Sequence, residues 1–541
     1  MTAVRHRTTS NYPSGWSALA GLPGAAWLAL FVGVPVVALV VRVVDTDSLR
    51  VLRTSVPWRI GWFTLWQAVL SAVTALVVAL PVTWVLARHD FRMRRTVRAI
   101  VVSGFLLPSV VVGTAFVGLL PASLQRTWIA VVVAHAWFNV AVVVRVVGAR
   151  WERIDTGLTD AAALLGAAPL RRLRTVTLPL LAPALAAASA LVFLFCFTSY
   201  GIVRLLGGPG RVTIESDIAL RALQIGDVGA AAVLAVAQAA FLIVVAALST
   251  TLGPRIVRGV ALPRITARRI EVGAARRPRL VKVIVAVTLV VVCAPLVTLV
   301  VGSLRVGSAW SLGGWRSLFA GNPVRGSVAP SIGRSIDLLA AVSSSLRVAL
   351  IALLIALVLG ACTAFAAVHG GRGGRIGDSL ALVPLAISPV TVGLGMIVAF
   401  GPNAGNLRAS WWIVPIAHSL VALPLVVRLL VPVLRAVPPG LRDATATLGA
   451  SPWRTLRSVD LSLTRRALAG AGGLVVAVSV GEFGASSLLT RRGAETIPVV
   501  IARLMSRTGD VLRTQAFVLS TVLAVLCIAA MILVERGDAA R

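Results

Sequence analysis

The sequence predicts an all-α polytopic membrane protein with about twelve transmembrane helices, arranged as two parallel six-helix repeats. Composition, the length of the apolar runs and an internal repeat lead to this fold class. Of the 541 residues, 58% are hydrophobic and only 13% are charged. Soluble chains are about 45–50% apolar and about 25% charged, so this composition is typical of stacked membrane spans.

Twelve apolar runs are long enough to cross a bilayer, which takes about 20 helical residues. Because backbone groups find no partners in lipid, these runs should be helices despite their Gly and Pro residues. The first run exceeds the apolar region of a signal peptide, so we interpret it as an uncleaved helix. The predicted spans are residues 22–44, 62–87, 99–120, 128–148, 184–204, 230–252, 281–303, 345–368, 380–400, 411–434, 468–489 and 513–534.

The chain repeats itself at a constant offset of 283 positions, which indicates a tandem duplication. Each repeat holds six spans, an even number, so both copies have the same orientation. We divide the chain into an N-terminal segment (1–21), a first repeat (22–252), an Arg-rich linker (253–280), a second repeat (281–534) and a tail (535–541). Matching pairs include His135 with His418, Asp160 with Asp443, Gly166 with Gly449, Pro169 with Pro452, and Gly201 with Gly484.

The formal net charge of +33 comes from 52 Lys and Arg residues, gathered in short blocks between the apolar runs. This distribution is that of charges that set membrane topology, and not that of a nucleic-acid-binding face. Lys and Arg are more numerous in the segments that become cytoplasmic if the N-terminus is cytoplasmic. We therefore expect both termini in the cytoplasm and no nucleic-acid partner.

A loop predicted on the cytoplasmic side occurs twice, between spans four and five of each repeat. Asp160 can cap or begin a short helix, and Gly166 can end it in a left-handed conformation. Pro169 suits the first turn of a second helix, because its missing N–H costs nothing there. The same pattern recurs at Asp443, Gly449 and Pro452. Two such helix–turn–helix segments predict a docking surface for a two-fold symmetric partner.

These segments resemble the EAA loop of ABC importer permeases, which has Glu-Ala-Ala, three residues, Gly, and a later Leu-Pro. The first copy carries Asp in place of Glu and retains Leu178-Pro179, whereas the second has Ser462 in place of Pro. The resemblance implies two permease (ABC transmembrane type-1) domains with a type I importer fold, and loops that couple to ATP-binding subunits. The implied coupling residues are Asp160, Ala161, Ala162, Gly166, Pro169, Asp443, Ala444, Gly449 and Pro452.

The sequence contains no phosphate-binding loop of the form G-x-x-x-x-G-K-[ST]. We therefore expect that this chain is not an enzyme and binds no cofactor or metal, and that ATP and Mg²⁺ bind a separate ATPase, expected as a homodimer. The resemblance also implies an extracytoplasmic substrate-binding protein that docks on outer loops, the largest at about 304–341. The expected location is the plasma (inner) membrane of a bacterium.

The fusion of two permease halves resembles the ferric iron and thiamine branch of these importers. Two stretches carry this likeness, Phe197-Thr-Ser-Tyr-Gly201 with its following Gly-Gly-Pro, and Gly481-Glu-Phe-Gly484 with Thr496-Ile-Pro498. The resemblance implies ferric iron or thiamine as substrate, and leaves polyamines open.

Four residues are candidates for the substrate pathway: Glu482, its repeat partner Ser199, and the equivalent pair His135 and His418. An ionisable group inside a span suggests function, and Glu482 would attract a cation. The alternative is that Glu482 lies at a helix break, solvated or paired with Arg491. The histidines are either a gate or transient iron ligand, or packing residues inherited by duplication. Glu215 is expected in an outer loop.

Two other classes of protein fit less well. A gradient-driven secondary transporter of twelve helices would place several acids inside its spans, whereas only Glu482 is clearly placed there. A membrane-embedded enzyme would need a catalytic cluster, and no such cluster stands out. The four cysteines all fall in apolar runs, with no pair spaced as metal ligands.

Overall fold

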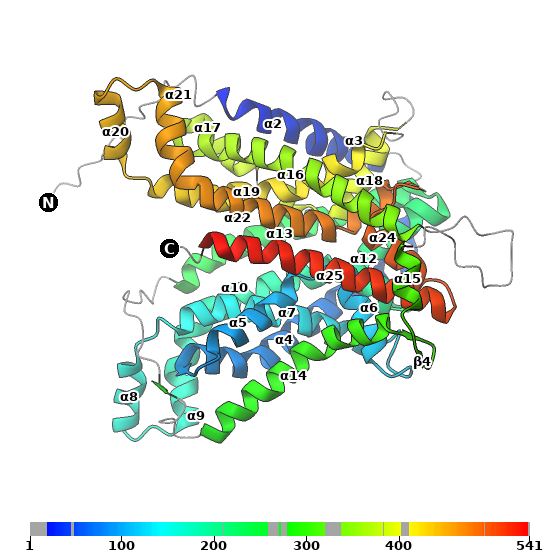
Figure 1. Ribbon diagram of the computed structural model, residues 1–541, viewed down its shortest axis with the longest axis horizontal. Coiled ribbons are helices and arrows are strands. Elements are labelled where there is room, and N and C mark those ends of the chain that lie inside the picture. Colours follow the sequence, from blue (N-terminus) through cyan, green and yellow to red (C-terminus); the bar gives the residue numbers. More distant parts are fainter. Residues whose placement is uncertain are drawn as a thin grey trace. The chain divides into compact units, whose positions relative to one another are not determined.

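The computed structural model describes residues 19–44, 48–208, 210–257, 270–271, 278–319, 337–381, 383–401, 410–491 and 493–538. Most of the predicted N-terminal segment and linker, the centre of the largest outer loop and the end of the tail lie outside these ranges. The described chain folds into two compact units (Figure 1). Unit 1 comprises Met1–Ser48, Arg334–Val500 and Leu523–Arg541, and unit 2 comprises Leu49–Gly333 and Ile501–Val522.

Unit 2 holds the first repeat without its first membrane helix, together with two helices from after the linker and a segment near the C-terminus. Its elements are η2 (Ser48–Arg53), α4 (Ser55–Arg88), β1 (His89–Asp90), α5 (Arg94–Ser103), η3 (Gly104–Leu106), α6 (Ser109–Leu119), α7 (Trp128–Trp151), α8 (Thr156–Leu164), α9 (Pro169–Arg172), η4 (Leu173–Thr177), α10 (Leu178–Phe197), α11 (Gly201–Leu206), α12 (Ile214–Leu220), η5 (Arg221–Ile225), α13 (Val228–Val257), β2 (Ile270–Glu271), α14 (Pro278–Ser303), β3 (Arg305–Val306), β4 (Ala309–Trp310) and α15 (Gly313–Phe319). The strands form two small sheets, with β1 parallel to β2 and β3 antiparallel to β4.

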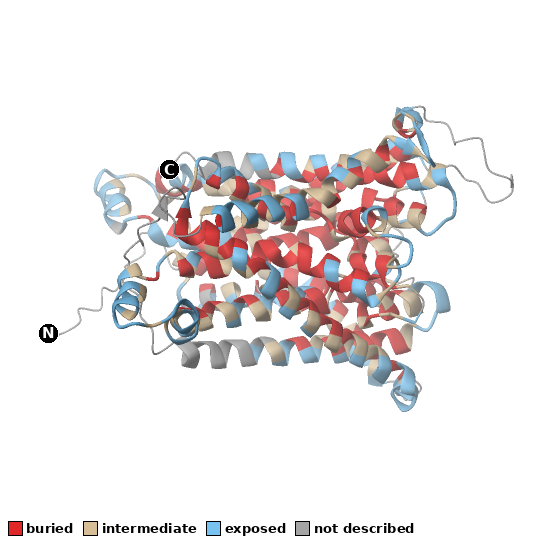
Figure 2. Ribbon diagram, turned by 90° about the horizontal axis from the view of Figure 1, so that it is seen from below, coloured by how far each residue is buried: buried red, intermediate tan, exposed pale blue. Residues whose placement is uncertain are grey.

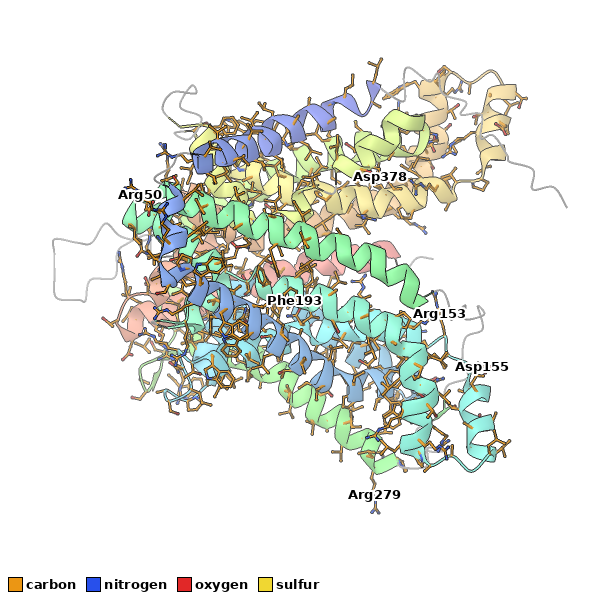
Figure 3. The ribbon with its side chains drawn as sticks, turned by 180° about the vertical axis from the view of Figure 1, so that it is seen from behind. Arg50, Arg153, Asp155, Phe193, Arg279 and Asp378 are labelled. Atoms are coloured by element: carbon orange, nitrogen blue, oxygen red, sulfur yellow. The ribbon has the colours of Figure 1, made fainter. Side chains whose placement is uncertain are left out.

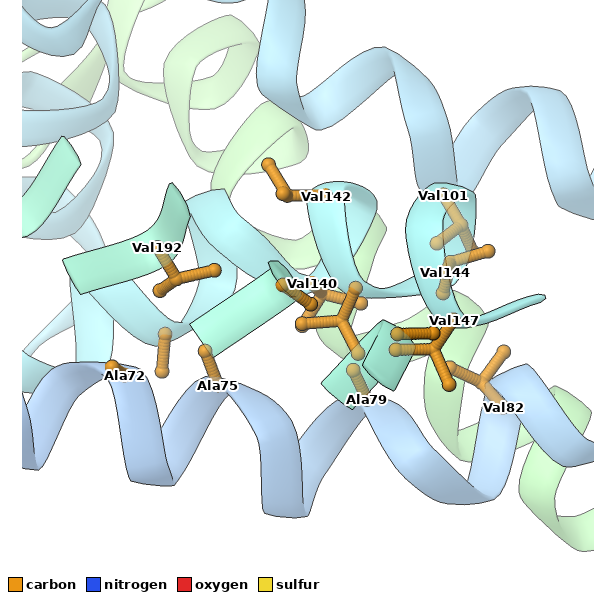
Figure 4. Packing of buried hydrophobic residues seen from close by; sticks show 14 of the residues in the cluster. Ala72, Ala75, Ala79, Val82, Val101, Val140, Val142, Val144, Val147 and Val192 are labelled. Atoms are coloured by element: carbon orange, nitrogen blue, oxygen red, sulfur yellow. The ribbon is translucent and has the colours of Figure 1, made fainter. Parts of the chain in front are cut away.

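Small residues on one side of α4 create the core of unit 2. Buried alanines recur on α4 at three- and four-residue spacing, which places them on one helical face. Short side chains let helices approach closely in a membrane, and valines of α7 together with Val192 of α10 fill the space opposite (Figure 4). The labelled core residues are Ala72, Ala75, Ala79, Val82, Val101, Val140, Val142, Val144, Val147 and Val192.

Unit 1 holds most of the second repeat and the N-terminal helix. Its elements are α2 (Leu22–Leu28), η1 (Ala29–Gly33), α3 (Val34–Val44), α16 (Leu338–His369), α17 (Gly371–Leu380), η7 (Val383–Ala386), α18 (Pro389–Ala399), α19 (Ile413–Ala436), α20 (Pro439–Thr447), α21 (Pro452–Thr455), η9 (Leu456–Asp460), α22 (Leu461–Gly481) and α23 (Gly484–Leu489). The division between units falls within α24 (Ile497–Met505) and α25 (Asp510–Asp538). Gly360 brings α16 against α19, since a Cβ there would lie 2.7 Å from Val426.

The compact units exchange the first helix of each repeat. In unit 1, α2 packs on α16, where a Cβ at Gly24 would clash with Thr363 Oγ1, and α3 packs on α18. In unit 2, α14 packs on α6, α4 and α5, and Trp137 Nε1 donates to Val291 O at 3.0 Å. The two compact units therefore do not coincide with the contiguous repeats 22–252 and 281–534. The division of the chain into these repeats stays a prediction from the sequence.

Among the described residues, ten helices are long and apolar enough to span a membrane, or eleven if one bent pair counts as a single span. Not every one of the twelve predicted ranges is a single continuous helix, and two of them differ most clearly. The third range bends by 105° between Leu106 and Ser109, and the ninth is divided into the short turn η7 and the short apolar helix Pro389–Ala399. Pro108 and Pro389 lie at these breaks, where proline disfavours a continuous helix. Buried residues run along the helices, while exposed ones lie in the loops, at helix ends and on helix faces (Figure 2).

Candidate functional site

Each unit carries one copy of the repeated helix–turn–helix. We call residues 156–177 (α8, α9 and η4) the first coupling segment, and residues 439–460 (α20, α21 and η9) the second coupling segment. In unit 2 the first coupling segment lies at the opposite end of the helices from β4 (Figure 1). Both segments end in a π-helical turn, Leu173–Thr177 and Leu456–Asp460, at positions related by the repeat. The duplication has therefore preserved the backbone as well as the sequence.

The turn between the two short helices has the same hydrogen bonds in both copies. Gly166 has φ +79° and Gly449 has φ +73°. Gly166 N donates to Ala163 O, and Ala167 N donates to Ala162 O, each at 3.0 Å. Gly449 N and Ala450 N make the equivalent bonds. This is a Schellman ending, in which glycine takes the left-handed conformation, as the sequence predicts.

Pro169 and Pro452 occupy the first position of α9 and α21, also as predicted. The prediction that the acidic residue begins the helix is wrong, since Asp160 and Asp443 lie in the middle of α8 and α20. Asp155 caps α8 instead, and its Oδ1 accepts from Gly157 N at 2.9 Å (Figure 3). Asp160, Ala161 and Ala444 are exposed, whereas Ala162 is half-buried.

Large apolar side chains are exposed at both turns. Leu164 and Leu165 are 90% and 89% exposed, and Leu448 is 86% exposed. Leucines are normally buried, and clustered exposed ones indicate a site where another protein binds. Both turns therefore present large apolar side chains on the surface, as the predicted docking surface would.

The first coupling segment is anchored just before it begins. Arg88 Nη1 donates to Ile154 O at 2.9 Å, and Ile154 is fully buried. Glu152 Oε1 accepts from both Arg94 and Arg98, each at 2.9 Å. These contacts fix the end of α7 against α4 and α5, so the exposed turn projects from a rigid base.

Glu482 lies at the break between α22 and α23 and is 7% exposed. Its two oxygens accept from Ala485 N and Ser486 N, each at 2.9 Å, so the carboxylate caps α23. His418 Nε2 lies 3.2 Å from Glu482 Oε2 and 2.7 Å from Ser486 Oγ, and its Nδ1 lies 2.8 Å from Ser479 Oγ. The helix break is confirmed, but the carboxylate is buried against His418 and backbone amides and is not solvated or paired with Arg491.

The equivalent positions in unit 2 carry a different set of groups. Ser479, Glu482 and Ser486 correspond at the 283-residue offset to Cys196, Ser199 and Val203. His135 is 1% exposed, its Nδ1 lies 3.3 Å from Ser71 Oγ, and its Nε2 has no hydrogen-bond partner in the described chain. Ser199 is 8% exposed, between α10 and α11. The carboxylate–histidine pair is therefore built only in the second repeat.

Glu215, which the sequence predicts in an outer loop, is buried within a short helix. It lies in α12, fully buried, and its Oε1 accepts from Gln238 Nε2 of α13. Asp217 in the same helix is 4% exposed and pairs with Arg221 at 2.7 Å. The short helix α12 has too few apolar residues in a row to stand out in the sequence, and Gln238, a polar residue within the apolar run of α13, is the signal that could have indicated a polar partner.

The profile of the family described as "Binding-protein-dependent transport system inner membrane component" matches residues 79–258 and 352–539, together more than half of the chain. The chain belongs to this family. The two matches begin after the exchanged first helices and each contain one coupling segment. The protein is thus the membrane-spanning permease of an ABC importer, with the type I fold, and such permease subunits are not themselves enzymes.

Curated relatives match this permease over its whole length. It is 26% identical to the thiamine transport system permease protein ThiP of Brucella suis, over 100% of this chain and 99% of the relative. It is 24% identical to ThiP of Escherichia coli K12, over 95% and 93% of the two chains. A putative 2-aminoethylphosphonate transport system permease protein, PhnV of Salmonella typhimurium, is 31% identical over 36% of this chain and 73% of its own.

Proposed function

We propose that this permease forms the membrane pathway of a thiamine importer. The observation that carries the proposal is the similarity to thiamine permeases along the full length of both chains. The fused two-repeat arrangement, with one coupling segment in each repeat, agrees with it. Ferric iron is the other substrate to which the sequence resemblance points, and no curated relative described above carries that name.

The proposed partners follow from the two exposed turns and from the family's description. A homodimeric ATPase binds one coupling segment with each subunit and carries the ATP and Mg²⁺, while this chain binds neither. An extracytoplasmic binding protein delivers the substrate. The chain lies in the bacterial plasma membrane with both termini in the cytoplasm, which places the coupling segments on the ATPase side.

Glu482 and His418 are the proposed pathway residues of the second repeat, and Ser199 and His135 those of the first. Thiamine carries a permanent positive charge on its thiazolium ring, so a carboxylate beside the pathway lowers the energy of the cation at that depth. Glu482 supports this role because it is held at a helix break by two amides. Its orientation is therefore fixed before substrate arrives.

The test is reconstitution of the chain with its ATPase and binding protein in proteoliposomes. ATP hydrolysis and uptake are measured with thiamine, ferric iron, spermidine and 2-aminoethylphosphonate in separate samples. We expect thiamine alone to stimulate both. Stimulation by another ligand would replace thiamine as substrate while leaving the importer intact, whereas an ATPase that never binds the chain would refute the proposed partner arrangement.

A further inference from the structure

The second coupling segment contains a buried ion pair. Arg442 Nη2 lies 2.5 Å from Asp460 Oδ1, and Arg442 Nε donates to the same oxygen at 3.1 Å. The two side chains are 11% and 1% exposed. Arg442 belongs to α20, the helix that presents the exposed turn, and Asp460 ends the π-helical turn that leads into the long helix α22.

The same guanidinium also reaches a third helix. Arg442 Nη2 donates to Leu434 O at 3.3 Å, in the last turn of α19. Thr445 of α20 adds a contact, because its hydroxyl lies 3.0 Å from that of Thr455 in α21. One side chain of the exposed helix is thus bonded to the last turn of α19 and to the residue that immediately precedes α22.

The first coupling segment has no charged counterpart at these positions. At the 283-residue offset, Arg442 and Asp460 correspond to Thr159 and Thr177. Thr159 Oγ1 donates within its own turn, to Thr156 O at 2.8 Å. The threonine that contacts α21 is replaced by Ala162. The two copies therefore hold the same backbone by different contacts.

A second difference lies at the same junction. Pro179 stands in the first turn of α10 in the first repeat, where its ring fixes φ, and Ser462 replaces it in the second. A buried ion pair does not by itself stabilise a fold more than apolar packing would, because both charges must lose their water. The buried ion pair lies at the start of α22, where the second repeat lacks the proline. Its role is better explained as holding α20 in a defined position relative to α22.

We propose that Arg442 and Asp460 are positioning residues that transmit the movement of the second coupling helix to α19 and α22. This inference rests on the proposed coupling role of both segments. The second repeat then has a connection of its own between the coupling segment and the long helices, which is the ion pair. The first repeat makes the equivalent connection through the Leu178-Pro179 junction and the contacts that precede α8.

The test measures thiamine transported per ATP hydrolysed in the reconstituted importer. We expect Asp460→Asn and Arg442→Gln each to lower this ratio by about tenfold, within the range typical of coupling between distant sites. The double variant R442T/D460T installs the residues of the first copy and leaves no unpaired charge. It should also lose coupling, whereas a purely structural pair would let it recover.

A covalent replacement makes the test independent of folding losses. In R442C/D460C, a short bismaleimide joins the two positions, and we expect the joined protein to regain most of the wild-type ratio while the unjoined protein does not. The matched control is T159C/T177C in the first copy, where joining should leave the ratio unchanged. Wild-type coupling in R442T/D460T, or no gain on joining, overturns the proposal. Absence of ATP-driven uptake in the wild type would instead refute the proposed function.

Discussion

The left-handed glycines of the two turns give the sharpest test of the coupling segments. Gly166 and Gly449 have φ of +79° and +73°, and a Cβ added at either would meet no atom within 4 Å. The cost of alanine there is therefore conformational and not steric. A non-glycine residue in the left-handed region costs roughly 1–2 kcal/mol, which lowers the population of the native turn by about 5- to 30-fold.

The double variant G166A/G449A should therefore bind the ATPase weakly, with costs that add because each turn lies in its own repeat. Binding is measured as the ATPase concentration that gives half-maximal ligand-stimulated hydrolysis in proteoliposomes. Asparagine tolerates the left-handed conformation, so G166N/G449N should stay closer to wild type.

Gly440 provides a matched control in the same segment. It lies in α20, has no neighbour within 4 Å of an added Cβ, and does not have a positive φ. Alanine is a better helix former than glycine by up to about 1 kcal/mol, so Gly440→Ala should leave ATPase binding unchanged. If alanine at Gly166 and Gly449 behaves like alanine at Gly440, the left-handed turn is not needed for docking and the reasoning fails.

Three further predictions concern packing, capping and protonation. Gly302→Ala places a Cβ 2.7 Å from the ring of Phe517 and should lower the free energy of unfolding by about 1–3 kcal/mol, which is measured as a lower Tm. Gly61→Ala is the control, because an added Cβ there has no neighbour within 4 Å and the Tm should not fall. Equal Tm values for the two variants would contradict this prediction. Glu482→Ala removes the cap of α23 and its charge, whereas Glu482→Gln keeps one acceptor. If the charge acts on the substrate, both slow thiamine uptake at matched expression; uptake by the alanine variant at the wild-type rate would exclude both roles. Burial lowers the pKa of His89 below its usual 6.5, and the charge of Arg88 lowers it further, opposing the backbone hydrogen bond of Val85. The unfolded chain then takes up the proton first, so this contribution to stability is present above pH 6.5 and is lost as pH falls through the folded pKa. Unfolding curves measured between pH 5 and 8 should show that His89→Gln loses less stability than the wild type as the pH falls. An unchanged dependence of stability on pH would count against this prediction.

The sequence by itself determined the features that depend on local chemistry. The presence of many membrane-spanning helices, the 283-residue repeat and the family resemblance needed only apolar runs and matching residues. The turns at Gly166 and Gly449 and the helix starts at Pro169 and Pro452 also followed, because glycine and proline restrict the backbone wherever they stand. The sequence offered a helix break at Glu482 as one alternative; the structure has that break but pairs the carboxylate with His418 and backbone amides, and the pathway role stays a prediction.

Tertiary structure decided everything that joins residues far apart in the chain. The exchange of α2–α3 and α14 between the compact units, the burial of Glu215 against Gln238, and the contact of His418 with Glu482 all depend on which helix faces pack together. The pairing of Arg442 with Asp460 was missed for the same reason, although only 18 residues separate them. Hydropathy indicates that a helix crosses the membrane, but small side chains and polar partners on neighbouring helices decide which face it buries.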